Sequence, residues 1–386
     1  MPSHHHFLML LLLFLSTTTK MTSYNIIDFG AKNDNITDSA NAFIGAWKAA
    51  CRSMEAANVS VPAGRFLLSR TLFEGPCNNS DIRVLIEGII VAPSNYSALR
   101  EWVTFKHVEG VSIYGGTLDA QGQALWDCKN SSRRCPAGAT TLTVMHSNNV
   151  TINGVNLINS EMFHMSIYGS SNVTVQAVNI TAPGDSPNTD GIHIHMSSAV
   201  TVTNSVISTG DDCISMGHGT NAVWIENITC GPGHGISIGS LGGGATDEAG
   251  VANITVKTVI FSGTQNGIRI KTWANPIAGF VTNVTFENIT MNFVDNPIIV
   301  DQNYCPRKTN CPNMTSDIAI SQISYMNITG SSATLVAVKF ACSPTKPCSG
   351  ISMQNIMLTY DNKPALALCQ NVNGTTVGLI VPESYL

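Results

Sequence analysis

The chain has 386 residues, of which 12% are charged and 44% hydrophobic, and its formal net charge is −5. This negative balance argues against nucleic acid as a partner, but not against an acidic polymer, because local cations decide what a groove binds. Beyond the amino terminus, no stretch approaches the length of a membrane-spanning helix, so we expect no membrane partner after processing.

The amino terminus carries an uninterrupted apolar run, Phe7–Leu15, followed by Ser16 and three threonines. The run is too short to span a bilayer and is typical of a secretory signal. We therefore predict a signal peptide over about residues 1–22 and a secreted mature chain over residues 23–386. Many Asn-X-Ser/Thr sequons fit export, and we expect glycans only on exposed ones.

Cysteine usage also fits an exported protein, because the chain holds eleven cysteines. No CxxC spacing occurs, so disulfides are favoured over a metal site, and we expect neither a metal nor a cofactor. Sequence proximity suggests five bonds, and Cys369 falls outside them: Cys51–Cys77, Cys128–Cys135, Cys213–Cys230, Cys305–Cys311 and Cys342–Cys348.

The first elements of the mature chain predict a covered solenoid end. Tyr24 to Asp34 is expected to form a short strand and a turn. Thr37 or Asp38 can cap a following helix, whose apolar residues recur at helical spacing: Phe43, Trp47, Ala50 and Met54. An amphipathic helix here would cover the apolar interior that a stack of coils exposes at its end.

From residue 59 onward the chain repeats short, alternating β-branched strands with no convincing helix. Equivalent positions are separated by 23 to 34 residues: Val150, Val173, Val200, Val223, Ile254, Val284, Ile318 and Ile351. Such a period predicts a solenoid, here an all-β parallel β-helix forming one domain. The segment around Trp126 is expected to continue the coils, with a polar loop projecting between Cys128 and Cys135. The pattern persists to about Leu368, and the conformation of the tail 374–386 is left open.

Four motifs interrupt this repeat, in the stretch from Ser186 to Lys271. They are Asn188-Thr189-Asp190, Gly210-Asp211-Asp212-Cys213, Gly231-Pro232-Gly233-His234-Gly235 and Arg269-Ile270-Lys271. Asp190 and Asp211 are 21 residues apart, and Asp212 and His234 are 22 apart, which matches one coil. Successive coils lie about 4.8 Å apart, so these side chains are predicted to form a short column.

The residue types in this column suit the cleavage of an anionic sugar chain. Glycoside hydrolysis needs one protonated carboxylic acid and one ionised carboxylate. Clustered acids raise the proton affinity of one member, because neighbouring like charges cannot all ionise. Arg269 and Lys271, at i and i+2 of a strand, point the same way and can hold substrate carboxylates.

The motifs NTD, GDD, GHG and RIK, in this order and spacing, resemble those of the polygalacturonases, the pectin-cleaving family 28 of glycoside hydrolases. The segments 182–194 and 231–242 are most similar to plant enzymes, especially pollen exopolygalacturonases. The resemblance covers essentially the whole mature chain. It implies a right-handed, single-stranded parallel β-helix of the pectin-lyase-like type, a polygalacturonate substrate, the plant cell wall or apoplast as location, and a monomer.

The resemblance also implies roles for individual residues. Asp211 would be the general acid, and Asp190 and Asp212 would activate the attacking water in one inverting step. His234 would hydrogen-bond the acids and keep the donor protonated. Substrate binding would fall to a last group of residues: Asn188, Arg269, Lys271 and Tyr304. Attack from the chain end is expected, with endo attack as the alternative.

Two other functions and several histidines are weighed against this hypothesis. A calcium-dependent pectate lyase shares the architecture, but the GHG and RIK motifs fit it poorly. A non-catalytic wall-binding β-helix would make the three acids dispensable. The remaining histidines are interpreted as structural or loop residues: His146, His164, His193, His195 and His218.

Overall fold

The computed structural model describes residues 21–95, 99–131, 134–244, 246–306, 308–384 and 386. The predicted signal peptide lies outside the described residues, apart from its last two positions. Part of the loop between Cys128 and Cys135 lies outside them too. Among the described residues, no helix is long and apolar enough to cross a membrane.

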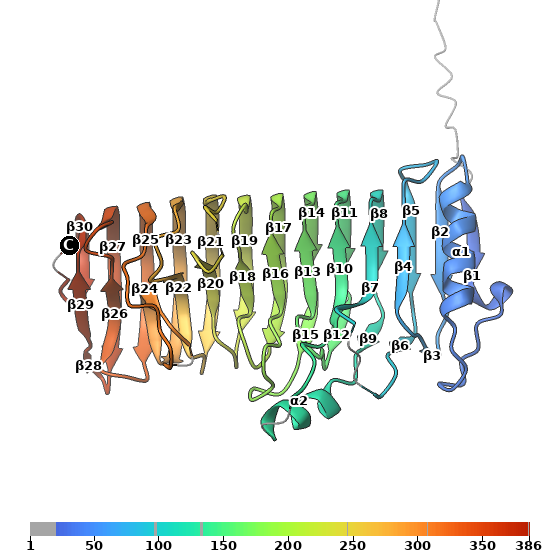
Figure 1. The fold of residues 1–386 in the computed structure, drawn as a ribbon, viewed down its shortest axis with the longest axis horizontal. Helices are drawn as coiled ribbons and strands as arrows, with labels where there is room; N and C mark the ends of the chain where they lie inside the picture. Colours follow the sequence, from blue (N-terminus) through green and yellow to red (C-terminus); the bar gives the residue numbers. More distant parts are fainter. Residues whose placement is uncertain (1–20, 96–98, 132–133, 245, 307, 385) are drawn as a thin grey trace, which may run out of the picture.

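Short strands stack side by side along the long axis of the molecule as a right-handed parallel β-helix, which confirms the predicted fold (Figure 1). An 11-stranded parallel sheet carries the residues of interest: β4 (Thr71–Glu74), β7 (Glu101–Lys106), β10 (Thr140–Met145), β13 (Met165–Tyr168), β16 (Ile192–His195), β18 (Ile214–Met216), β20 (Ile236–Leu241), β22 (Asn266–Trp273), β24 (Asn296–Tyr304), β26 (Val336–Ala341) and β29 (Leu366–Gln370).

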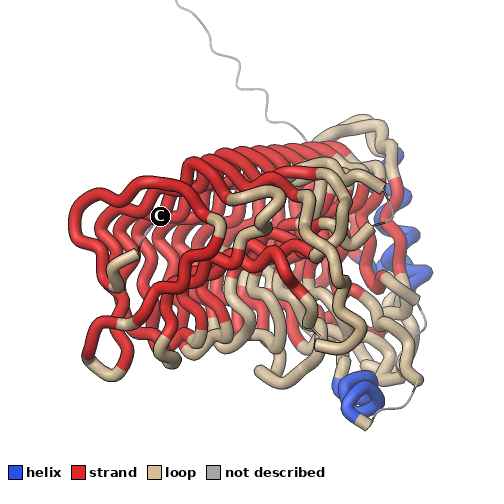
Figure 2. The backbone as a smooth tube through the Cα atoms, turned by 60° about the vertical axis from the view of Figure 1, so that its left-hand side comes forward, coloured by secondary structure: helices blue, strands red, loops and turns tan. Residues whose placement is uncertain are grey.

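The remaining strands form a 19-stranded sheet that wraps the other sides of each coil (Figure 2). Its strands are β1 (Thr22–Asn25), β2 (Ala57–Val61), β3 (Arg65–Leu67), β5 (Ile82–Ile86), β6 (Ile89–Val91), β8 (Glu109–Tyr114), β9 (Thr117–Asp119), β11 (Asn148–Asn153), β12 (Asn156–Ile158), β14 (Ser171–Gln176), β15 (Asn179–Thr181), β17 (Ser198–Ser208), β19 (Asn221–Cys230), β21 (Val251–Ser262), β23 (Gly279–Val294), β25 (Ile318–Ser332), β27 (Cys348–Tyr360), β28 (Lys363–Pro364) and β30 (Val372–Val381).

The core is a set of apolar columns inside the coils. In one column, Ile192, Ile214 and Ile236 pair in register and are all buried. Ile268 and Ile298 continue it. Alternate residues of each strand point outward, so a strand places one set of side chains in this core and the other on the outer surface.

The 3-10 helix η1 (Ile26–Phe29) and helix α1 (Ala40–Arg52) stand at the N-terminal end, where a capping helix was predicted. The predicted boundaries were wrong in detail. Ser39 is the N-cap residue, although the Asp38 carboxylate accepts a hydrogen bond of 3.0 Å from Ala40 N. Met54 lies beyond the helix and is exposed, because the chain turns into β2 before another turn of helix can form.

The segment around Trp126 is a second helix, α2 (Gln123–Asn130), so the prediction of a further coil there was wrong. Leu125 and Cys128 are buried at helical spacing. The Trp126 indole donates a 3.1 Å hydrogen bond to Ser160 O, which ties the helix to the lower edge of the solenoid (Figure 1). This tertiary contact outweighs the strand pattern of the flanking sequence.

The predicted register of the repeat holds from Val150 to Val284 and then needs one correction. Val284 pairs with Ile323 and not with Ile318, and Ile323 pairs with Ile351. The spacing is misleading because the long segment after β24 inserts extra residues before β25. The tail also forms a strand, because β30 pairs in parallel with β27. All five disulfides suggested by sequence proximity are present.

Candidate active site

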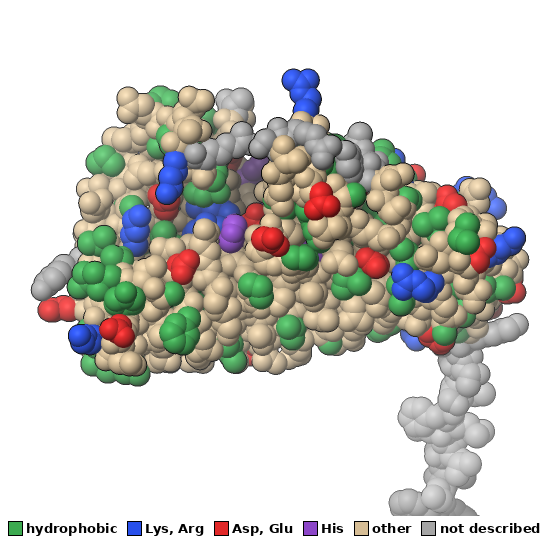
Figure 3. All heavy atoms as spheres, turned by 90° about the horizontal axis from the view of Figure 1, so that it is seen from below, with side chains coloured by type: hydrophobic (Ala, Val, Ile, Leu, Met, Phe, Trp, Pro, Cys, Tyr) green, Lys and Arg blue, Asp and Glu red, His purple; other side chains and the backbone are tan. Residues whose placement is uncertain are grey.

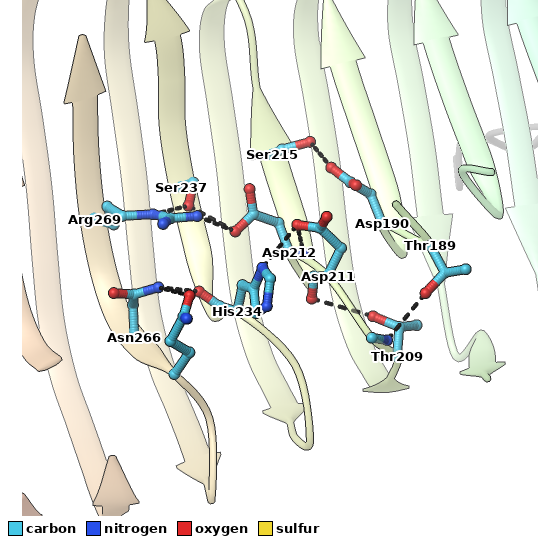
Figure 4. Close-up of polar contacts among 12 residues, drawn as sticks. Thr189, Asp190, Thr209, Asp211, Asp212, Ser215, His234, Ser237, Asn266 and Arg269 are labelled. Atoms are coloured by element: carbon cyan, nitrogen blue, oxygen red, sulfur yellow. Dashed lines mark hydrogen bonds and ion pairs between the residues drawn. The ribbon is translucent and has the colours of Figure 1, made fainter. Parts of the chain in front are cut away.

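Three of the four motifs lie in turns that enter neighbouring strands of the 11-stranded sheet, whereas Arg269 and Lys271 lie within β22. Asp190, Asp212 and His234 each stand two residues before the first residue of β16, β18 and β20, respectively. Those first residues pair in register, so the three motif residues are equivalent positions on successive coils. The column predicted from the spacing is therefore present (Figure 4).

Glycines let these turns pack backbone against backbone. A Cβ atom on Gly210 would lie 2.0 Å from Ser186 O in the preceding coil. Gly235 has a φ of +85°, and a Cβ there would lie 2.1 Å from Asn266 O in the following coil. No larger residue fits either position unless the backbone of these turns shifts.

Asp212 is the most deeply buried acid of the cluster, with 1% of its surface exposed. Its Oδ1 accepts hydrogen bonds from Ser237 Oγ at 2.8 Å and Arg269 Nη2 at 2.8 Å, and its Oδ2 accepts one from Lys271 Nζ at 2.7 Å. Burial acts to raise the pKa of Asp212, but the positive charges of Lys271 and Arg269 outweigh it and lower the pKa to about 2. Asp212 therefore favours the ionised form.

Asp190 lies in the opposite electrostatic environment. Its side chain is buried and accepts a 2.7 Å hydrogen bond from Ser215 Oγ. Burial, followed by the negative charges of Asp211 and Asp212, raises the pKa of Asp190 well above its usual value. The cluster thus contains one acid that favours a proton and one that does not.

Asp211 is the accessible member of the three acids, with 19% of its side chain exposed. Its Oδ1 accepts a 2.8 Å hydrogen bond from Asp212 N and lies 3.0 Å from His234 Nδ1. His234 N also donates to Asp211 O at 2.8 Å. His234 is thus fixed to Asp211 through both backbone and ring, and 35% of its side chain reaches solvent.

The expected substrate-binding residues are only partly gathered at this site. Tyr304, at the end of β24, has its ring centroid 5.5 Å from Lys271 Nζ and 6.0 Å from Arg269 Cζ. Both cations are more than nine-tenths buried. Asn188 is exposed in the turn before Asp190 and makes none of the hydrogen bonds described for this network.

Sequence reasoning missed Ser215 and Ser237, which hold Asp190 and Asp212 in place. Each serine stands three residues after a motif position and shares one register column with His193 and Arg269. That regular placement in the sequence could have identified both serines. His164, predicted to be structural, is fully buried, and its Nδ1 lies 3.2 Å from Asp190 O.

The site lies in a hollow in which acidic and basic side chains gather beside a histidine, between two raised walls (Figure 3). The outward face of the 11-stranded sheet forms the floor of this hollow, and the exposure of its side chains differs along the axis of the solenoid. Thr104 on β7 and Thr141 and Thr143 on β10 alternate with core residues and therefore point outward, yet all three are buried. On β13 and β16 the outward residues are partly exposed, namely Ser166, Tyr168, His193 and His195. Ser215 and Ser237, on β18 and β20, are buried again where they contact Asp190 and Asp212. The floor is therefore covered over β7 and β10.

Asp211, Asp212 and His234 can bring one ligand atom each within 4.8 Å of one another, a grouping that could hold a metal ion. The chemistry of the site opposes this, because both Asp212 oxygens already face Arg269 and Lys271. A divalent cation would have to compete with two positive charges at less than 3 Å.

Fold and site together are those of a β-helical enzyme that cleaves carbohydrate. The sequence model of the glycosyl hydrolases family 28 matches residues 51–379, and the chain belongs to this family.

Relatives agree with this membership, and a solved structure agrees with the fold. The chain is 51% identical over 368 residues to a polygalacturonase of Prunus persica, covering 94% of this chain and 93% of the relative. It is 42% identical over 366 residues to an exopolygalacturonase of Platanus acerifolia, covering 93% and 96%. The fold is similar to that of the endo-xylogalacturonan hydrolase of Aspergillus tubingensis, with a TM-score of 0.81 at 23% identity, covering 93% and 99%.

Proposed function

We propose that this protein is a secreted polygalacturonase of the plant cell wall that hydrolyses α-1,4-galacturonosidic bonds as a monomer. The observation that carries the proposal is the gathering of Asp190, Asp211 and Asp212 beside the buried cations Arg269 and Lys271. Relatives named polygalacturonase and exopolygalacturonase support the same substrate.

Asp211 is the proton donor to the leaving oxygen. It is the acid of the cluster whose side chain reaches the surface of the hollow, and His234 orients it. A general acid at this position lowers the barrier by protonating the departing sugar as the bond breaks.

Asp212 and Asp190 position and deprotonate the attacking water, giving inversion in a single displacement. Asp212 stays ionised because of its two cations. Burial and the charges of Asp211 and Asp212 raise the pKa of Asp190, which favours its protonated form in the unliganded cluster. The productive form is the one in which this proton has passed to Asp211, which leaves Asp190 able to accept a hydrogen bond from water.

Arg269 and Lys271 bind the uronate carboxylate beside the scissile bond. Arg269 has five N–H donors, and it uses two of them, from Nε to Ser237 Oγ at 2.9 Å and from Nη2 to Asp212. Lys271 has three donors and uses one on Asp212. A substrate carboxylate that takes up further donors draws positive charge away from Asp212. The basicity of Asp212 then rises when substrate is bound. Tyr304, beside both cations, and Asn188, at the rim, complete the proposed binding residues.

Cleavage from the chain end is favoured over cleavage within the polymer. The covered floor over β7 and β10 supports this, because a long chain lying along the groove would meet that cover. Two relatives named exopolygalacturonase, at 42% and 38% identity, support it as well. Endo attack is the alternative, since the relative at 51% identity is named only polygalacturonase.

Chromatography of early products from polygalacturonate tests these proposals. Monomer alone is expected from exo attack, whereas a ladder of oligomers would establish endo attack. An unsaturated uronate absorbing in the ultraviolet, formed only with calcium, would instead establish a lyase. No product from the pure protein would favour a binding protein and overturn the hydrolase.

A further inference from the structure

The two cations that contact the cluster, Arg269 and Lys271, both lie on one side of the proposed donor Asp211. Arg269 and Lys271 stand on β22, C-terminal to the column of acids. A polyuronate carries a carboxylate on every sugar, so a unit bound on the other side of the acids also needs a partner for its charge. On β16, whose coil also carries Asp190, and on the strands before it, the described residues of the 11-stranded sheet offer only Lys106, His193 and His195 as groups that can be positive.

Two of these three groups are already engaged. Lys106 lies three coils before His195 in an ion pair of 3.7 Å with Glu74. His193 has its Nδ1 2.7 Å from Ser215 Oγ, and its ring stacks on Phe163 at a centroid distance of 4.6 Å.

His195 is different, because its partner is a second imidazole. His195 Nε2 lies 3.0 Å from His218 Nε2, with the rings perpendicular and their centroids 4.2 Å apart. Both side chains are partly exposed. Only one proton can lie between the two Nε2 atoms, so one ring donates and the other accepts. The accepting ring must carry its own proton on Nδ1, and the neutral pair therefore already presents one N–H donor.

A second proton gives the pair a full positive charge without breaking its internal hydrogen bond. That proton occupies the remaining Nδ1, so the charged pair offers an N–H from each ring. Burial and then the charge of His218 lower the pKa of His195, and Glu248 acts against them. His193 and Tyr168 are the other titratable groups beside the pair, with ring centroids 5.9 Å and 5.4 Å from His195. An incoming carboxylate stabilises the charged form, as Glu248 does.

The spacing between the histidine pair and the cations Arg269 and Lys271 follows from the order of the strands. Ile194, Met216, Ile238 and Ile270 pair in register, and the residues that directly follow them are His195, Gly217, Gly239 and Lys271. The two positions between His195 and Lys271 are thus glycines. Three coil steps amount to about 14 Å. The proposed donor Asp211 precedes β18, which lies between β16 with His195 and β22 with Lys271, so the interval has room for a sugar on each side of the donor.

We propose that the His195–His218 pair binds the carboxylate of the galacturonate unit on the side of the scissile bond opposite Arg269 and Lys271. The inference rests on the proposed polygalacturonate substrate and adds a specificity-determining site to it. Binding at this site strengthens as the pH falls, because only the protonated pair offers both charge and two donors.

The test uses His195→Gln and His218→Gln, which keep a polar side chain but cannot titrate. In the wild type, KM for trigalacturonate is expected to rise with pH between 4 and 7. In each variant KM should be about 10-fold higher at acidic pH and nearly independent of pH, because one charge-assisted contact is lost. The value of kcat should change little, and His107→Gln, an exposed imidazole three coils away, is the matched control.

Equilibrium binding separates this inference from the proposed function. Calorimetry with trigalacturonate in an Asp211→Asn background should show about 10-fold weaker binding when His195→Gln is added, and no difference for the fully methyl-esterified sugar. Unchanged affinity and unchanged KM would overturn the pair as a binding site, even if hydrolysis is normal. A fall in kcat with KM constant would assign the pair a structural role. Normal binding without any hydrolysis by the wild type would instead overturn the hydrolase.

Discussion

Replacing Asp211 by Asn isolates the proposed proton donor with little change to the fold. The Asp211 carboxylate accepts hydrogen bonds from Asp212 N at 2.8 Å and from the His234 ring at 3.0 Å, both through Oδ1. An asparagine carbonyl oxygen can accept both, and the side chains have nearly the same shape. The free energy of unfolding should therefore change by no more than about 1 kcal/mol. The variant lacks an acidic proton that it can donate to the leaving oxygen.

The catalytic loss should be large. Proton donation by a positioned acid is worth about 10² to 10⁴ in rate, or roughly 3 to 5 kcal/mol of barrier. We expect kcat on polygalacturonate to fall at least about 100-fold. KM should stay near the wild-type value, because the Asn substitution leaves Arg269, Lys271 and their contacts unchanged.

Reducing-end release from polygalacturonate measures this loss, and an aryl galacturonide supplies the decisive comparison. A nitrophenolate leaves without protonation, so Asp211→Asn should lose much less activity on that substrate. Asp81→Asn, at an exposed acid before β5 in the other sheet, is the control for the change of charge. Equal losses on both substrates, or no loss on either, would refute the role of Asp211 as the acid.

Three further predictions concern the groups around the acids. Lys271→Met should raise the pKa of Asp212 and so move the acidic limb of the pH profile to higher pH. It should also lower kcat/KM by about 30-fold or more, as expected when one partner of a buried charge pair is truncated. His164 has its pKa lowered to about 4 by burial. Because its folded pKa lies below the unfolded value of 6.5, stability should fall by roughly 3 kcal/mol as the pH drops from about 6.5 to 4, and His164→Gln should flatten this dependence in urea titrations. Removing the Cys213–Cys230 bond, which closes 17 residues, should cost about 3 kcal/mol in unfolding free energy and also reduce kcat, since Cys213 follows Asp212 directly.

For each of these three predictions, one result would contradict the reasoning. An unchanged pH profile in Lys271→Met would show that the charge of Lys271 does not control Asp212. A wild-type stability that is flat between pH 4 and 6.5 would contradict the buried neutral state of His164. The bond between Cys305 and Cys311, which closes only 6 residues, serves as the control for Cys213–Cys230 and should contribute less.

The errors in predicting the fold are informative because they fall outside the regular coils. Trp126 lies in a helix because its indole and its buried neighbours dock on the chain near Ser160, a contact that no local periodicity reveals. The partner of Val284 was misplaced because an inserted segment shifted the apparent period. In both cases a tertiary contact or an insertion outweighed the local pattern.

The sequence by itself determined the stack of coils and the column of site residues. Apolar residues recurring once per coil must bury against each other, so the turns before β16, β18 and β20 are forced to lie one above another. Asp190, Asp212 and His234 occupy the same place in those turns, and their proximity follows from register alone.

Only the tertiary structure decided which acid pairs with which partner. Asp212 turns to Arg269 and Lys271, whereas Asp211 turns to His234, although the two acids are adjacent in the chain. Burial depth and the side-chain conformations of residues up to 59 positions apart set these pairings, and with them the opposite pKa shifts of Asp190 and Asp212. Periodicity places residues on a face, but it carries no information about which charges meet there or how much water reaches them.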